Sequence, residues 1–153
     1  MTSHVSEYKA APSDKALAHF QGRLSFEADC WDVYDSGKNG TRDYVILDVR
    51  GPNAYAKGHV PGAINLPHRE ISSETLAEFA PDTLFVVYCA GPHCNGANKA
   101  AIALAKLGRP VKEMIGGVTG WLDEGLVLEA RAGETGVRGF CKHEAPPAIA
   151  AAE

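Results

Sequence analysis

The chain has 153 residues, 45% of them hydrophobic and 22% charged, with a formal net charge of −4. This length fits one domain that buries about two thirds of the surface of its unfolded chain. Because acidic residues outnumber basic ones, the net charge does not favour binding to nucleic acid, and no apolar run is long enough to cross a membrane. Residues 1–16 lack the apolar stretch of a secretion signal, so we expect a cytoplasmic protein whose four cysteines are free thiols.

The first half of the chain alternates between helical and extended apolar spacing. The uninterrupted apolar run 44–49 predicts a strand covered on both faces, and Ser72 can cap a helix that carries Leu76 and Phe79. In chain order the spacing predicts a helix over 13–21 that Gly22 ends, a strand over 24–27, a helix after Asp29 that ends at the glycines of 37–40, a strand over 44–49, a helix over 52–57, a strand over 63–66 and a helix over 72–79.

The second half continues the alternation. An apolar strand over 84–88 stops at Cys89, and a helix with apolar residues at helical spacing runs from about Ala97 to Gly108. A strand over 111–115 and a short helix with Trp121 follow. This order predicts an α/β fold, a parallel sheet flanked by helices on both faces, with its ligand site at the carboxyl ends of the strands. We expect an N-terminal extension over 1–22, a domain over 23–128 and a flexible, Ala- and Pro-rich tail over 129–153.

The segment from Cys89 to Ala97 has the composition of a reactive-thiol loop between a strand and a helix. Backbone N–H groups of such a loop converge on its centre, and the first turn of the helix adds positive potential. That field should lower the pKa of Cys89 below its ordinary value. Cys89 alone could be a small buried hydrophobe, but two cysteines that bracket a Gly-Pro-His turn favour chemistry at sulfur.

Four motifs in one order resemble those of a single-domain rhodanese, a sulfurtransferase module, over about residues 24–125. The motifs are Leu47-Asp48-Val49-Arg50, Tyr55-x-x-Gly58-His59-Val60-Pro61-Gly62-Ala63-Ile64-Asn65-Leu66-Pro67, Val87-Tyr88-Cys89 and Gly116-Gly117-x-x-Gly120-Trp121. The resemblance implies a five-stranded parallel sheet, with the nucleophilic cysteine after the fourth strand.

The same resemblance implies that Cys89 carries a persulfide between two half-reactions. The sulfur would come from thiosulfate, a polysulfide or a protein persulfide, and would pass to cyanide or another thiol, with neither a cofactor nor a metal ion. Partners would thus be small sulfur compounds or sulfur donor and acceptor proteins, and neither nucleic acid nor a membrane. The loop that would surround the persulfide contains Ala90, Gly91, Pro92, His93, Asn95, Gly96 and Ala97.

The loop departs from the family pattern because it is longer, has no Arg or Lys and contains Cys94. Binding of a dianion would then depend on amides, the helix end and a protonated His93. Cys94 lies nearer the helix start, so it is either the nucleophile itself or a second thiol that resolves a Cys89 persulfide as a disulfide. Its position at the strand end favours Cys89 as the carrier.

Other residues of the motifs are interpreted as structural. Asp48 and Arg50 should pair near the loop, and His59 should satisfy backbone groups of a tight connection. His68 has no assignable role. We expect Trp31 and Trp121 in the core, with Cys30 packed as a thiol beside Trp31.

Three other functions deserve comparison. A phosphatase of the Cys-x5-Arg type would need Arg where this chain has Asn95. A zinc site formed by Cys89, His93 and Cys94 would lack a fourth ligand. A rhodanese-like module that senses redox state or binds a partner through the Cys89/Cys94 pair remains the main alternative.

Overall fold

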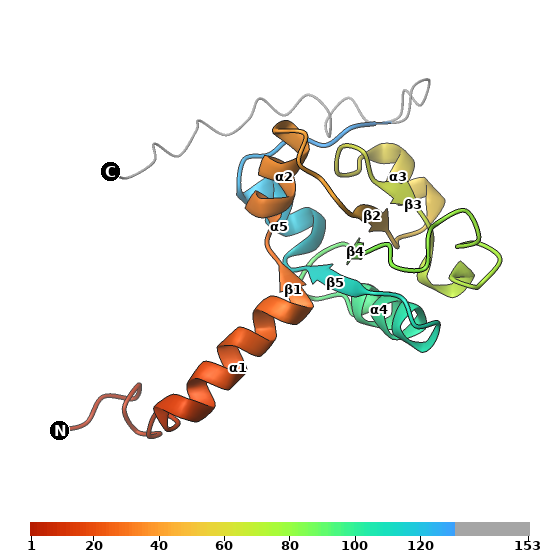
Figure 1. The fold of residues 1–153 in the computed structure, drawn as a ribbon. Coiled ribbons are helices and arrows are strands. Elements are labelled where there is room, and N and C mark those ends of the chain that lie inside the picture. Colours follow the sequence, from red (N-terminus) through yellow and green to blue (C-terminus); the bar gives the residue numbers. More distant parts are fainter. Residues whose placement is uncertain (131–153) are drawn as a thin grey trace.

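The computed structural model describes residues 1–130 of the chain (Figure 1). Its centre is a five-stranded sheet in the order β1-β5-β4-β2-β3, and all four strand pairs are parallel. The strands are β1 (Glu27–Ala28), β2 (Val45–Asp48), β3 (Ile64–Asn65), β4 (Phe85–Tyr88) and β5 (Val111–Met114). The helices are α1 (Ser13–Phe26), α2 (Cys30–Lys38), α3 (Pro52–Lys57), α4 (Gly96–Lys106) and α5 (Gly117–Asp123), with a 3₁₀ turn η1 (His68–Glu70). The predicted fold class is confirmed.

Side chains of the central strand β4 alternate between two apolar layers, because successive residues of a strand face opposite sides. Val86 and Tyr88 join the layer that contains Val33 of α2 and Trp121 of α5. Phe85, Val87 and the following Cys89 join the other layer, with Ala97, Ala100 and Leu104 of α4. The strand thus directs the Cys89 side chain toward α4.

Helix α1 is longer than the predicted helix over 13–21, which corrects the expected end at Gly22. A glycine inside an exposed helix costs only about 1 kcal/mol, which does not end the helix by itself. Its last turn is held by Arg23, which pairs with Glu27 at 3.1 Å, and by Lys112 Nζ, which donates to the Leu24 carbonyl at 2.8 Å. The predicted strand over 24–27 is accordingly reduced to Glu27–Ala28.

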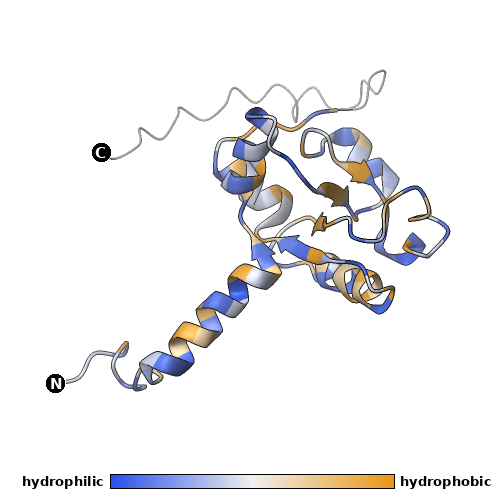
Figure 2. Cartoon of the chain, in the orientation of Figure 1, coloured by the Kyte–Doolittle hydropathy of each residue, from blue (hydrophilic) through white to orange (hydrophobic). Residues whose placement is uncertain are grey.

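No residue of α1 is buried, and the helix projects from the β1 edge of the sheet (Figure 1). Figure 2 shows apolar and polar residues mixed along its surface. No helix within residues 1–130 combines the length and the apolar character that a membrane span requires.

The predicted helix over 72–79 is wrong: this segment forms successive turns. The expected cap exists, since Thr75 N donates to Ser72 Oγ at 3.2 Å. However, within this segment only Leu76 N bonds four residues back, to the Ser72 carbonyl at 3.2 Å, whereas Phe79 N bonds three residues back, to the Leu76 carbonyl at 3.0 Å. The carbonyls of Leu76 and Phe79 also accept hydrogen bonds from Arg109, each at 3.2 Å, so a tertiary contact holds these turns.

The two tryptophans differ in burial. Trp121 is 1% exposed, as predicted, and its Nε1 donates to the Val127 carbonyl at 3.1 Å. Trp31 is 52% exposed, so its expected place in the core is wrong. It lies on the outer side of α2, where its ring packs on that of Tyr34 with centroids 5.3 Å apart. The predicted tail over 129–153 lies, from residue 131 on, outside the described residues.

Candidate active site

The start of α5 holds the loop that follows β4 through backbone hydrogen bonds. Val118 N donates to the Cys89 carbonyl at 3.1 Å, and Thr119 N donates to the Ala90 carbonyl at 3.0 Å. A Cβ at Gly117, where φ is +55°, would collide with the Cys89 carbonyl oxygen. Because L side chains disfavour that φ and no space exists for one, a glycine here lets α5 lie directly against the loop.

The loop brings the two thiols of Cys89 and Cys94 together. Cys94 N donates to the Gly91 carbonyl at 3.0 Å, which closes a turn. The Cys94 sulfur accepts a hydrogen bond from Gly96 N at 3.4 Å, and the two thiols are joined by a side-chain hydrogen bond. A Cβ at Gly96 would lie 2.7 Å from the Cys89 sulfur and 3.4 Å from that of Cys94, so both sulfurs lie over this glycine.

Of this pair, Cys94 is the thiol whose pKa is lowered. The hydrogen bond from the Cys89 S–H lowers the pKa of Cys94, and the N–H groups of Gly96 and Ala90 and the charge of Lys99 lower it further. Burial raises the pKa of Cys89 to about 11, and the hydrogen bond to Cys94 acts in the same direction. The expectation of a lowered pKa at Cys89 is therefore wrong. Cys89 is only 8% exposed and donates its proton, whereas Cys94 is half-buried at the start of α4.

A cavity of about 480 Å³ opens beside the two cysteines, at the carboxyl ends of β2 and β4. Its walls come from the segment after β2, from η1 and from the first turn of α4. The lining residues are Val49, Arg50, Gly51, Pro67, His68, Arg69, Cys89, Cys94, Asn95, Gly96 and Lys99. Basic side chains thus reach the site from outside the loop.

Sequence reasoning missed His68, Arg69 and Lys99 because it searched for cations only within the loop. Arg69 and Lys99 are exposed, and neither makes an ion pair within the 130 residues described. The available signal was topological: residues 67–69 follow the strand next to β2, and the carboxyl ends of parallel strands meet at one edge.

The charge of Arg50, by contrast, is already engaged. Its Nη2 lies 2.7 Å from Asp48 Oδ2, its Nε lies 3.0 Å from Asp48 Oδ1, and the carboxylate is fully buried. Tyr88 also donates to Asp48 Oδ2, at 2.8 Å, and accepts from Val60 N at 3.0 Å. This buried network joins β2, β4 and the 58–61 connection beneath the site.

His59 belongs to the same connection and lies outside the cysteine cavity. Its Nδ1 lies 2.8 Å from the Tyr55 carbonyl oxygen, and its ring stacks on that of Tyr55 with centroids 3.8 Å apart. Its backbone exchanges two hydrogen bonds of 2.8 Å with Glu129. These contacts support the structural role that the sequence suggested.

Several other loop residues line a second cavity, of about 490 Å³, which shares Cys94 and Asn95 with the first. It is lined by Ala90, Pro92, His93, Cys94, Asn95 and Asn98. His93 therefore approaches Cys94 but does not line the Cys89 cavity. Ala97 of α4 belongs to the apolar layer that also contains Val87 and Cys89. Gly91 lies against the side chain of Thr119.

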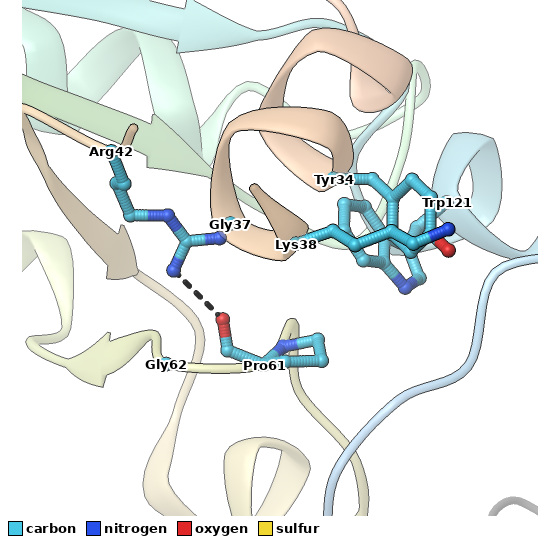
Figure 3. Close-up of a pocket in the computed structure, with 7 residues that line it drawn as sticks. All are labelled: Tyr34, Gly37, Lys38, Arg42, Pro61, Gly62 and Trp121. Carbon is cyan, nitrogen blue, oxygen red and sulfur yellow. Dashed lines mark hydrogen bonds between the residues drawn. The ribbon is translucent and has the colours of Figure 1, made fainter. Parts of the chain in front are cut away.

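A third cavity, of about 370 Å³, lies between α2, α5 and the Pro61-Gly62 turn (Figure 3). Arg42 crosses one side of it and donates to the carbonyls of Pro61 at 3.0 Å and Val33 at 3.3 Å. No cysteine lines this cavity. Residues 1–130 contain no group of three or more His, Cys, Asp or Glu side chains that could hold a metal ion.

Comparison with known proteins agrees with this architecture. The Rhodanese-like domain family matches residues 33–124. The thiosulfate sulfurtransferase GlpE of Pseudoalteromonas translucida is 36% identical over 81 residues, which are 52% of this chain and 73% of GlpE. The HTH-type transcriptional regulator Rv0324 of Mycobacterium tuberculosis is 37% identical over 90 residues, 59% of this chain but only 39% of that regulator. The crystal structure of the BH2092 protein of Bacillus halodurans superposes with a TM-score of 0.75 at 37% identity, covering 78% of this chain and 87% of that one.

The protein thus has an α/β fold with a parallel sheet, and its two neighbouring thiols lie in the loop that follows the central strand β4. The chain belongs to the Rhodanese-like domain family. Its relatives named as sulfurtransferases place it within a sulfurtransferase family.

Proposed function

We propose that this protein is a sulfurtransferase that carries sulfane sulfur as a persulfide on Cys89, with Cys94 as its auxiliary thiol. The observation that carries the proposal is the hydrogen-bonded pair of thiols, which faces a cavity with basic walls at the end of β4. Such a pair supplies a nucleophile and a group that takes its proton, as covalent catalysis requires.

In the first half-reaction the Cys89 sulfur attacks the outer sulfur of the donor. Because its lowered pKa makes Cys94 the first of the pair to ionise, its thiolate accepts the Cys89 proton as the attack proceeds. With thiosulfate, the bond between the two donor sulfurs breaks and sulfite leaves with the bonding electron pair. Cys89 then holds one additional sulfur.

In the second half-reaction the acceptor removes that outer sulfur. Cyanide or an acceptor thiol attacks it, the bond to Cys89 breaks, and the Cys89 thiolate recovers its proton from Cys94. The basic side chains of Arg69 and Lys99 favour donors that carry negative charge, such as thiosulfate or a polysulfide. A reducing cytoplasm would keep both cysteines in the thiol form that this cycle needs.

The test is sulfur loading of the reduced protein. With thiosulfate or polysulfide as donor and cyanide present as acceptor, we expect the chain to take sulfur onto Cys89 and to pass it on as thiocyanate, so that thiocyanate formation reports the sulfur that Cys89 gains. Cys89→Ser should gain none. Cys30→Ser is the matched control, because Cys30 is buried elsewhere and donates to the Ile115 carbonyl, which serine can also do. Equal thiocyanate formation by Cys89→Ser and wild type would refute Cys89 as the carrier.

The same contact between thiols also favours a second candidate, a redox-sensing module in which the pair cycles between dithiol and disulfide. A sensor would form the disulfide with peroxide yet show no turnover of thiosulfate or polysulfide. Steady-state assays with these sulfur donors therefore separate the two functions.

A further inference from the structure

We propose that Cys94 resolves the Cys89 persulfide within the loop and so releases sulfide, which makes the domain a sulfane-sulfur reductase when no acceptor is present. This inference rests on the proposed function, because it needs the persulfide as its starting point. It adds a product, sulfide, that transfer to cyanide or an external thiol does not form.

The geometry supplies the reacting atoms in contact. The sulfurs of Cys89 and Cys94 are hydrogen-bonded to each other and lie over the same face of Gly96. Both line one cavity, so a sulfur atom added to Cys89 lies in the space that Cys94 faces. A disulfide requires the two sulfurs to meet, and the position of a Cβ on Gly96 lies 2.7 Å from one and 3.4 Å from the other.

The step balances without an outside reagent. Cys94, which took up the Cys89 proton during loading, passes that proton to the outer sulfur of the Cys89 persulfide, and its thiolate attacks the inner sulfur. The bond between the inner and outer sulfurs breaks, and the outer sulfur leaves as hydrosulfide with the bonding electrons. The two cysteines are oxidised to a disulfide, and the sulfane sulfur is reduced by two electrons. The departing anion is formed beside Lys99 and Arg69, whose positive charge favours its release.

Access favours this internal step over transfer to bulky acceptors. Cys89 is 8% exposed, so an outside thiol must enter the cavity before it can attack, whereas Cys94 is already there. Intramolecular reactions between groups in contact gain greatly in effective concentration. To return to the dithiol, the protein needs a dithiol reductant, which becomes a disulfide as it reduces the Cys89–Cys94 bond.

The experiment is a single turnover without acceptor. The full chain is reduced, freed of reductant and mixed with thiosulfate, which releases sulfite but no sulfide when it loads the protein. We expect about one sulfide released per chain, together with a mass loss of two hydrogen atoms that dithiothreitol reverses. Cys30→Ser should behave as wild type. Cys94→Ser, loaded at alkaline pH where Cys89 ionises without help, should keep its added sulfur and release no sulfide.

Two outcomes overturn the inference, and they differ. If wild type keeps one added sulfur with no sulfide and no disulfide, the internal step is refuted while the proposed function stands. If neither wild type nor Cys94→Ser ever gains sulfur or releases sulfide, the proposed function fails, and this step fails with it.

Discussion

At the scale of single residues, the sulfur chemistry depends on which of the two thiols, Cys89 or Cys94, loses its proton first. Cys94 accepts hydrogen bonds from Cys89 and from Gly96 N, whereas Cys89 is buried against α4. The two protons are therefore released in succession from a coupled pair, with that of Cys94 first. The pair thus contains a thiol that ionises first and can then accept a proton, Cys94, and the thiol that becomes the sulfur carrier, Cys89.

Replacement of Cys94 by serine should move the pH dependence of persulfide formation upward. In wild type the first proton leaves Cys94, whose pKa is lowered, and its thiolate then accepts the proton of Cys89. In Cys94→Ser only Cys89 remains, and burial keeps its pKa above the ordinary value. Since each pH unit is worth a factor of about ten in thiolate concentration, the rate at neutral pH should fall by about tenfold or more and recover at alkaline pH.

Stopped-flow rates of persulfide formation across the pH range measure this shift. Cys30→Ser provides the reference, since its cysteine lies outside the cavity. An unchanged midpoint in Cys94→Ser would show that Cys94 takes no part in ionising Cys89.

Lys99 should contribute to binding of anionic donors. It lies in the first turn of α4, lines the cavity and lowers the pKa of Cys94. Because exposed charge interactions are worth about 0.2–1 kcal/mol, Lys99→Ala should raise KM for thiosulfate by roughly 1.4- to fivefold, and salt should diminish the difference. Lys106→Ala, an exposed lysine on the same helix that does not line the cavity, is the control. Equal KM values for the two variants would exclude a local role for Lys99.

At the scale of elements, the start of α4 positions both thiols because it begins with glycine. Gly96→Ala places a methyl group 2.7 Å from the Cys89 sulfur, so the sulfur must move. We expect persulfide formation to slow at least severalfold, while the alanine itself favours the helix by about 1 kcal/mol. Gly22→Ala in α1 is the matched control: nothing lies within 4 Å of its Cβ, so it should leave the sulfur chemistry unchanged. Comparable loading rates in Gly96→Ala and wild type would contradict this role.

The elements also show what a single sequence can predict. Three elements could be predicted because the spacing of their apolar residues alone determines them: the strands at 44–49 and 84–88 and the helix from about Ala97. The turns over 72–79 could not, since their apolar spacing also fits a helix and the Arg109 contacts that hold them come from thirty residues or more away along the chain. The charge on Cys94 likewise depends on a contact between side chains, which spacing does not reveal.

At the scale of the whole molecule, a buried network of hydrogen bonds across the sheet supports the site. Tyr88, the residue directly before Cys89, connects Asp48 of β2 to the backbone of Val60 through its hydroxyl group. Asp48 in turn holds Arg50, which lines the cavity. The network was predicted only in part: the motif indicated the Asp48–Arg50 pair, but not the tyrosine that completes it.

Tyr88→Phe should lower the free energy of unfolding. The change leaves Val60 N–H without its acceptor and removes one donor from a fully buried carboxylate, and an unsatisfied buried group costs about 1–3 kcal/mol. Urea unfolding followed by circular dichroism measures the loss. Tyr8→Phe, at an exposed tyrosine, should change the midpoint little, and equal midpoints for the two variants would contradict the network's contribution.

The proposed sulfur transfer depends most directly on the Cys89 sulfur as the atom that receives the donor's sulfur. The decisive measurement is peptide mass spectrometry of Cys94→Ser and Cys89→Ser after loading with thiosulfate at alkaline pH, where either remaining thiol can ionise. We expect one added sulfur atom on Cys89 in the first variant and none in the second. A persulfide on Cys94 in Cys89→Ser, formed as fast as in wild type, would contradict it.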